Sequence, residues 1–177
     1  MHVKAKQIAF GGLLLAVTVV CMALGSVIET NTLFLLAAAA FGVGIVIREF
    51  GLRTGVAFYL AAVLLGFLVT PNKFYVITFA AMGFYILGIE AVWMFLAEKT
   101  TDGTYGWDFF GLQNILIFNL VYLPCLFGFR SMLFQKAVSD QLLLAAVMVG
   151  QIAILVYDKA YQYVQGTLWE KWRKRVL

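Results

Sequence analysis

Six apolar runs divide this chain, and nearly all of its charged residues lie in the gaps between them. Only 12% of its 177 residues are charged and 63% are hydrophobic, whereas a soluble domain usually carries about 25% charged residues. A helix that crosses a bilayer needs about 20 mainly apolar residues. The sequence therefore predicts an all-α, polytopic membrane helix bundle with six transmembrane helices. We expect one integral membrane domain over residues 1–177, because no stretch remains for a separate soluble domain.

The second and third runs are shorter than the others. They are expected to recruit flanking residues, thin the bilayer or span it only partly. The turn between them, residues 48–53, is charged, and small residues spaced four apart surround it. Such spacing lets helices approach closely in lipid, so this hairpin is expected at the centre of the bundle. The six predicted segments are residues 7–28, 33–47, 54–70, 74–97, 112–134 and 141–157, and the small pairs are Ala38/Gly42, Ala40/Gly44 and Gly51/Gly55.

The first run raises a question of processing. His2, Lys4 and Lys6 precede it, and Ala23-Leu24-Gly25 resembles a signal-peptidase site. The run is longer than the apolar region of an ordinary signal peptide. A retained first helix is therefore the favoured interpretation.

The distribution of Lys and Arg predicts the orientation. If the N-terminus is inside, only Lys73, Arg130 and Lys136 of the thirteen Lys and Arg residues fall outside. Cytoplasmic segments carry the excess of such residues, so both termini are predicted to be cytoplasmic in a multi-pass protein of a bacterial inner membrane. The Trp-rich and basic tail, residues 169–175, is expected to anchor in the headgroups of membrane lipids, and a specific partner site is the alternative.

Glu90 is the only carboxylate well inside a predicted span. Its sequence neighbours are apolar, and no Lys or Arg lies within a helical turn of it. Because a buried charge without a partner is costly, Glu90 is predicted to face the bundle, to be protonated, and to hydrogen-bond Asn119, Gln151 or a backbone carbonyl. A structural role and a mechanistic one are both open.

Amide side chains also lie within the apolar runs. Amides in membrane helices commonly hydrogen-bond neighbouring helices, which is the favoured interpretation here. At 100° per residue, the polar residues of the last helix share one face, which is expected to meet protein or water. The amides of the fifth run are Gln113, Asn114 and Asn119, and the stripe on the last helix is Asp140, Gln151, Asp158, Gln162 and Gln165.

The composition argues against an enzyme. The only histidine is His2, and the sequence has no Walker-type Gly-Lys-Ser/Thr. The two cysteines, Cys21 and Cys125, lie in different runs without a CxxC pair. No catalytic residue, metal site or cofactor is therefore predicted. The net charge of +4 is spread over the gaps between runs, which argues against a nucleic-acid partner.

The layout resembles the S component, the substrate-binding membrane subunit, of energy-coupling factor (ECF) transporters. The resemblance rests on six spans, cytoplasmic ends, short second and third segments and a centre rich in small residues. Ala5 and Ala9 match the AxxxA pattern of the family's first helix, and residues 50–55 are similar to its glycine-bearing turn between helices two and three.

This resemblance implies a subunit that takes up a vitamin or related micronutrient. The family binds its substrate near the outer face and docks through helix one on a transmembrane coupling subunit driven by two ATPases. Ala5 and Ala9 would then be docking residues. One departure is that the intramembrane polar groups lie mostly in the inner half of the chain's spans. The residues that would contact the substrate are Glu29, Asn31, Asn72, Lys73, Tyr75 and Arg130.

Two other functions remain open. A non-transporting membrane scaffold or accessory subunit would use the same small-residue faces to bind another membrane protein. An ion-coupled transporter would use Glu90, although no second intramembrane charge is clearly paired with it in the sequence.

Overall fold

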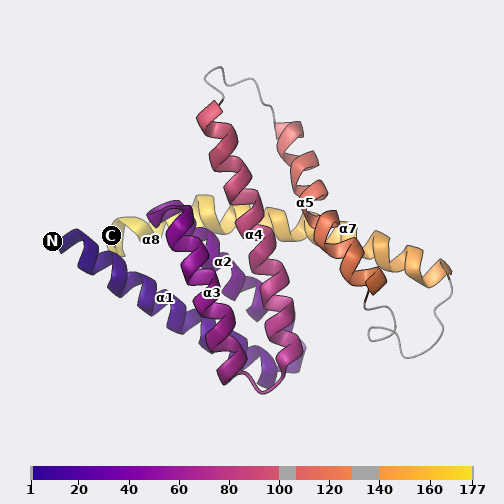
Figure 1. The fold of residues 1–177 in the computed structure, drawn as a ribbon, viewed down its shortest axis with the longest axis horizontal. Helices are drawn as coiled ribbons and strands as arrows, with labels where there is room; N and C mark the ends of the chain where they lie inside the picture. Colours follow the sequence, from indigo (N-terminus) through magenta and orange to yellow (C-terminus); the bar gives the residue numbers. More distant parts are fainter. Residues whose placement is uncertain (1, 100–106, 129–139, 177) are drawn as a thin grey trace.

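The computed structural model describes residues 2–99, 107–128 and 140–176, which form helices joined by short turns (Figure 1). This confirms the predicted all-α class. In chain order the elements are α1 (His2–Val27), the 3-10 turn η1 (Glu29–Asn31), α2 (Thr32–Phe50), α3 (Leu52–Val69), α4 (Lys73–Lys99), α5 (Trp107–Gly128), α7 (Asp140–Tyr163), the π-helical η2 (Val164–Trp169) and α8 (Glu170–Val176).

Several helices have the dimensions of membrane spans. Within the described residues, α1, α2, α3, α4 and the continuous helix from α7 into α8 are each long and apolar enough to cross a bilayer, which indicates a multi-pass membrane protein. α2 has 19 residues and α3 has 18, more than the apolar runs predicted, because both helices extend into the polar turn that joins them. α5 begins earlier than expected, at Trp107, and the predicted continuation over residues 129–134 lies outside the described part.

A turn between the second and third runs is confirmed, but it consists of Gly51 alone, because the charged residues predicted for it belong to the ends of α2 and α3. α2 ends at Phe50, and the N–H of Gly51 donates to the carbonyl of Ile47 at 2.8 Å. Gly51 has φ +86°, a left-handed conformation that favours glycine. α3 then returns along α2, and Gly55 faces Ile47 so closely that a Cβ at this position would overlap the isoleucine side chain.

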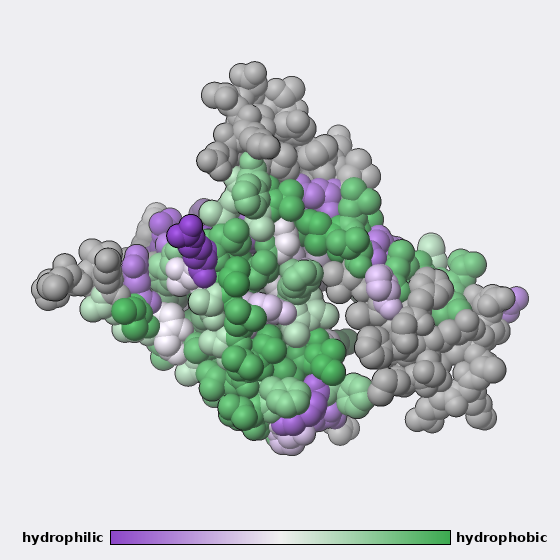
Figure 2. Space-filling model, in the orientation of Figure 1, coloured by the Kyte–Doolittle hydropathy of each residue, from purple (hydrophilic) through white to green (hydrophobic). Residues whose placement is uncertain are grey.

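α2 forms the centre of the bundle, packed by α1, α3 and α4. The predicted central position of the hairpin is confirmed for α2, which is the most buried of the candidate spans, whereas α3 is mainly exposed. α5 and α7 lie to one side of this four-helix group, and the helix from α7 to α8 crosses behind α4 and ends near the N-terminus (Figure 1). Apolar residues cover most of the visible face of the four helices (Figure 2), as expected for a lipid-facing surface.

Candidate functional site

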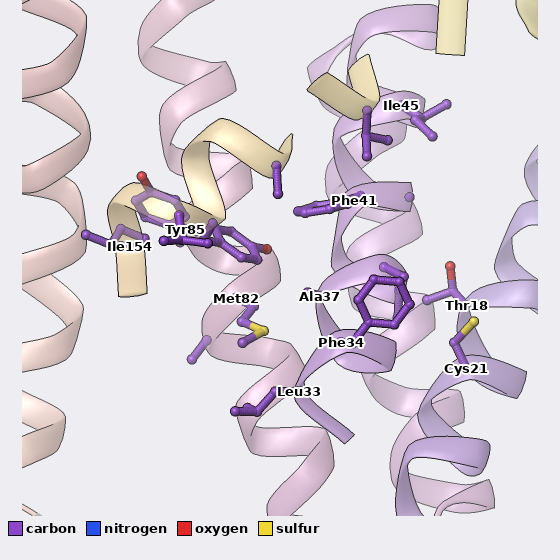
Figure 3. Close-up of a pocket in the computed structure, with 18 of the residues that line it drawn as sticks. Thr18, Cys21, Leu33, Phe34, Ala37, Phe41, Ile45, Met82, Tyr85 and Ile154 are labelled. Atoms are coloured by element: carbon purple, nitrogen blue, oxygen red, sulfur yellow. The ribbon is translucent and has the colours of Figure 1, made fainter. Parts of the chain in front are cut away.

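An apolar cavity of about 850 Å³ lies between α1, α2, α4, α5 and the helix of α7 and η2 (Figure 3). Phe34 and Phe41 follow one face of α2, with Cys21 of α1 on one side and Tyr85 of α4 on the other (Figure 3). No charged side chain is among the lining residues that the structure describes. The volume falls in the range of about 300–1,000 Å³ that is typical of small-molecule sites.

Two tyrosine–carboxylate hydrogen bonds join α4 to α7 beside this cavity. The hydroxyl of Tyr85 donates to Oδ1 of Asp158 at 2.5 Å, and that of Tyr161 donates to Oε1 of Glu90 at 2.6 Å. Each helix thus supplies one tyrosine and one acid. Asn114 of α5 donates to Oδ2 of Asp158 at 3.0 Å. The α5 and α7 wall of the cavity is therefore attached to the four-helix group by polar side chains.

Glu90 forms a salt bridge at the end of α2. Nη2 of Arg48 lies 2.6 Å from Oε1 of Glu90, and Nε donates to the same oxygen at 2.8 Å. The Arg48 guanidinium also lies 5.5 Å from the ring centre of Tyr161. The side chain of Glu90 is 7% exposed, and that of Arg48 is 41% exposed. The acid is thus buried, and the base reaches the surface.

The predicted partners of Glu90 were wrong. Its described partners are Arg48 and Tyr161, not an amide or a backbone carbonyl. The neutral acid was predicted because no cation lies near Glu90 in the sequence. That premise fails, because the last turn of α2 brings a guanidinium to the carboxylate. Asn119 and Gln151 instead hydrogen-bond each other at 2.8 and 3.3 Å, so the prediction of amide bonds between helices is confirmed for this pair.

The polar stripe on the last helix faces protein for much of its length. Gln151 and Asp158 are partly buried, and Gln165 is 2% exposed. Gln162, however, is exposed, and the side chain of Asp140 lies outside the described part. This polar face thus packs on protein, with Gln151 on α5 and Asp158 on both α4 and α5.

The C-terminal tail binds the rest of the protein through Trp169 and Arg173. Nε1 of Trp169 donates to Oε1 of Glu49 at 2.9 Å, and Nε of Arg173 lies 3.0 Å from the same oxygen. The Trp169 ring packs on Phe10 of α1, with 5.4 Å between ring centres. Trp172 remains exposed. Trp169 and Arg173 thus contact protein, and the lipid anchor stays a prediction for the rest of the tail.

The outer-loop residues implied by the ECF resemblance do not line the cavity, as far as the structure describes them. Asn72 is exposed and accepts a hydrogen bond from the N–H of Phe74 at 3.1 Å, at the start of α4. Lys73 donates to the carbonyls of Phe67 and Thr70, the latter at 3.0 Å, at the end of α3. These two side chains therefore cap helix ends in the structure.

The other implied contacts are scattered. Asn31 is exposed in η1, and Tyr75 is partly buried against the core. Neither residue lines the cavity. The side chain of Glu29 and the whole of Arg130 lie outside the described part.

The proposed docking residues lie on an open face of α1. Ala5 and Ala9 are exposed, and so are Gly12 and Ala16, which continue the same helical face at i+3 and i+4 spacing. A Cβ built at Gly12 meets nothing within 4 Å. We call Ala5, Ala9, Gly12 and Ala16 the small-residue stripe.

Four residues at the helix junction were missed by the sequence reasoning: Arg48, Glu49, Tyr85 and Tyr161. Arg48 and Glu49 were read as charges of an exposed turn, and the helix that continues through them was not predicted. Tyr85 lies within a predicted apolar run and Tyr161 just beyond the end of the last one, and neither was singled out. Their hydroxyl groups, which usually need a partner when buried, were the available signal.

Comparisons with models of known protein families, with curated proteins and with solved structures found no match for this chain.

Proposed function

We propose that this chain is the substrate-binding membrane subunit of an ECF-type micronutrient uptake transporter. The observation that carries the proposal is the cavity of about 850 Å³ between the four-helix group and the α5 and α7 wall. Ligand sites in membrane bundles commonly form between helices, and most are apolar with few polar groups. The layout of the chain, which resembles the S component, supports the same function.

The lining restricts the substrate. A charged group in a cavity without a compensating charge would lose its hydration and gain no ion pair in exchange. The part of the substrate held here is therefore uncharged and mainly apolar, and the aromatic side chains of the wall, Phe34, Phe41, Phe118 and Tyr122 among them, favour ring-shaped groups. An uncharged, mainly apolar substrate in this cavity differs from what the ECF resemblance implies, which is a substrate held by outer-loop residues such as Glu29 and Lys73.

The small-residue stripe is the proposed docking face for a coupling subunit. Small side chains let the backbone of a partner helix approach closely, and α1 leaves this stripe free of the rest of the described chain. Two ATPases would act through the coupling subunit. A non-transporting scaffold is the second candidate, because the same exposed stripe suits the helix of any membrane partner.

Native mass spectrometry of the complex captured from membranes tests both parts of the proposal. The wild-type protein is expected to carry a small molecule and to bring a coupling subunit with its ATPases. Ala9→Trp should lose the coupling subunit, because overpacking of a helix contact typically costs about 1–3 kcal/mol, and should keep the small molecule. Ala37→Phe, which fills the cavity, should lose the small molecule.

Ala57→Trp is the matched control, because Ala57 is exposed on α3 and outside both sites. It should keep the small molecule and the partner. Stable capture of a membrane partner without ATPases, again lost in Ala9→Trp, would favour the scaffold. Capture of the coupling subunit that is unchanged by Ala9→Trp would contradict the docking face.

The proposed orientation places both termini in the cytoplasm. The turn at Gly51 and the turn at Asn72 lie at opposite ends of α3, so they should face opposite sides of the membrane. In a cysteine-free background, Asn72→Cys is expected to react with an impermeant maleimide added to intact cells. Arg53→Cys should react only after the membrane is opened. Labelling of Arg53→Cys in intact cells would reverse the orientation.

A further inference from the structure

The cavity is open to the outside of the bundle at the depth of the membrane interior. Some of its lining residues are deeply buried, such as Phe41, which is 8% exposed. Others are freely exposed, such as Val17, near the middle of the α1 span, at 50%. Lipid tails are as apolar as these side chains, so the opening faces hydrocarbon rather than water. We call the exposed lining residues the mouth (Val17, Leu33, Phe34, Val156 and Leu168) and the buried ones the floor (Ala39, Phe41, Tyr85 and Ile154).

The cavity is elongated along α2. Its lining residues on this helix run from Leu33 to Ile45, and Figure 3 shows Leu33, Ala37, Phe41 and Ile45 in this order along the helix. At a rise of about 1.5 Å per residue, this interval is about 18 Å long. One leaflet provides about half of the roughly 30 Å hydrocarbon thickness of a bilayer. The cavity therefore has the length of a hydrocarbon chain that crosses one leaflet.

Polar groups lie just beyond each end of this interval. At one end, Leu33 comes directly after Thr32 and the polar turn η1. At the other end, Ile45 is the last lining residue on α2, about one helical turn before Arg48, which pairs with Glu90. Leu33 and its neighbour Phe34 are 66% and 74% exposed. The η1 end is therefore the end at which the polar part of a lipid would remain at the membrane surface.

The polar atoms of the lining residues are turned to protein or covered. The Tyr85 hydroxyl donates to Asp158, and the Tyr122 hydroxyl donates to the carbonyl of Ala146 at 2.8 Å. The hydroxyl of Tyr157 is buried. Among the described lining residues this leaves Thr18, which is itself buried, and the weakly polar thiol of Cys21. A water-soluble substrate would lose its hydrogen bonds to water here and find few replacements.

We propose that the cavity binds a single hydrocarbon chain of a lipid-soluble molecule, which enters through the mouth from the bilayer. The polar end of the molecule stays at the level of η1, and the chain runs along α2 toward Ile45. The chain contacts the floor, which lipids that only surround the bundle do not reach. In the orientation proposed above, the molecule comes from the outer leaflet. This inference names the substrate class of the proposed function and, as a statement about substrate, rests on it.

Photo-crosslinking in a defined bilayer tests the inference. The full-length protein in nanodiscs of dioleoylphosphatidylcholine receives palmitic acid that carries a diazirine in the middle of its chain. Peptide mass spectrometry then maps the labelled residues. Labelling of Phe41 and Ile154 should saturate as the probe is increased, because the floor holds one chain. Labelling of Leu64, which is 66% exposed on α3 and outside the cavity, should rise in proportion to the probe.

Competition and a matched pair of variants define the site. Excess unmodified palmitic acid should abolish labelling of the floor in the wild type and leave Leu64 labelled. Ala37→Phe narrows the cavity and should lose the floor labelling. Ala57→Phe places the same side chain on the exposed face of α3 and should keep it. Circular dichroism of both variants checks the fold, and the competition arm decides the question without either variant.

The position of the diazirine tests the direction of the chain. A diazirine near the carboxyl end should label Leu33 and Phe34, and one near the methyl end should label Phe41 and Ile45. The reverse pattern would overturn the placement of the polar end at η1.

Two outcomes separate this inference from the proposed function. Floor labelling that is absent, or that rises in proportion to the probe as at Leu64, would show surrounding lipid only and overturn the bound chain. If the wild type then released a water-soluble molecule that Ala37→Phe loses, the proposed function would stand without this substrate class. Saturable floor labelling, with no coupling subunit captured from membranes, would keep the chain site and reject the proposed function.

Discussion

Gly44→Ala is expected to destabilise the protein by about 3 kcal/mol. A Cβ at Gly44 would overlap the hydroxyl of Tyr161 and lie 2.7 and 2.8 Å from two of its ring carbons. Tyr161 is buried and donates to Glu90, so its displacement adds the loss of a hydrogen bond to a charged group, about 1.5–3 kcal/mol, to an overpacking cost of about 1–3 kcal/mol. Alanine offsets about 1 kcal/mol of this through its greater helix propensity. Unfolding in mixed micelles of rising SDS content measures the difference.

Gly12→Ala is the control for helix propensity. Gly12 is also within a helix, but a Cβ there meets nothing within 4 Å. This variant should be neutral or more stable by up to about 1 kcal/mol. A double variant then locates the clash: adding Gly44→Ala to Tyr161→Ala should cost almost nothing further, because contacting residues are not additive. Equal losses from Gly44→Ala in both backgrounds would show that Tyr161 is not the obstacle.

Arg48→Gln is expected to lower the free energy of unfolding more than Glu90→Gln does, although the two residues form one salt bridge. Without Arg48, the buried carboxylate keeps only the Tyr161 hydroxyl among its partners in the described residues, and leaving a buried charge unpaired typically costs about 3–5 kcal/mol. Without the charge of Glu90, the Arg48 side chain can turn to water because it is 41% exposed, and the amide oxygen of Gln can still accept hydrogen bonds. Glu90→Gln should therefore lower the free energy of unfolding by about 1 kcal/mol.

The same unfolding measurement in SDS micelles checks this order. The double variant Arg48→Met/Glu90→Met should recover much of the stability that Arg48→Gln loses, because apolar replacement of a whole buried pair is often neutral. Arg53→Gln is the matched control, since Arg53 is an exposed base one turn away across Gly51. If Glu90 were instead a neutral acid, Arg48→Gln would cost little and Glu90→Leu would be the more harmful change.

The salt bridge also bears on ion coupling. Glu90 was a candidate for that role as a lone carboxylate inside a span. The structure gives it a guanidinium and a tyrosine hydroxyl, and both partners hold it at the junction of α2, α4 and α7. This geometry favours a structural role for Glu90, which connects α4 to α2 through Arg48 and to α7 through Tyr161.

The sequence by itself determined the class and the positions of most helices. Apolar runs of membrane-spanning length cannot leave backbone groups unpaired in lipid, so helices are the only solution for such runs. The turn at Gly51 was also predictable, because a charged stretch with a glycine separates two apolar runs and glycine tolerates φ +86°. Gly44 of the small pair Ala40/Gly44 does meet a distant element closely, but the contact is the side chain of Tyr161, which the sequence could not name.

The tertiary structure alone decided which polar groups meet. Arg48 and Glu90 are 42 residues apart, and Glu49 and Trp169 are 120 apart, so no local spacing relates them. Hydropathy records how costly a group is in lipid and contains nothing about which distant side chain offsets that cost. The crossing of the α7 to α8 helix behind α4 (Figure 1) brings Asp158, Tyr161 and Trp169 to their partners. The cavity follows from the same crossing, because it is the space that this helix leaves against α1, α2 and α4.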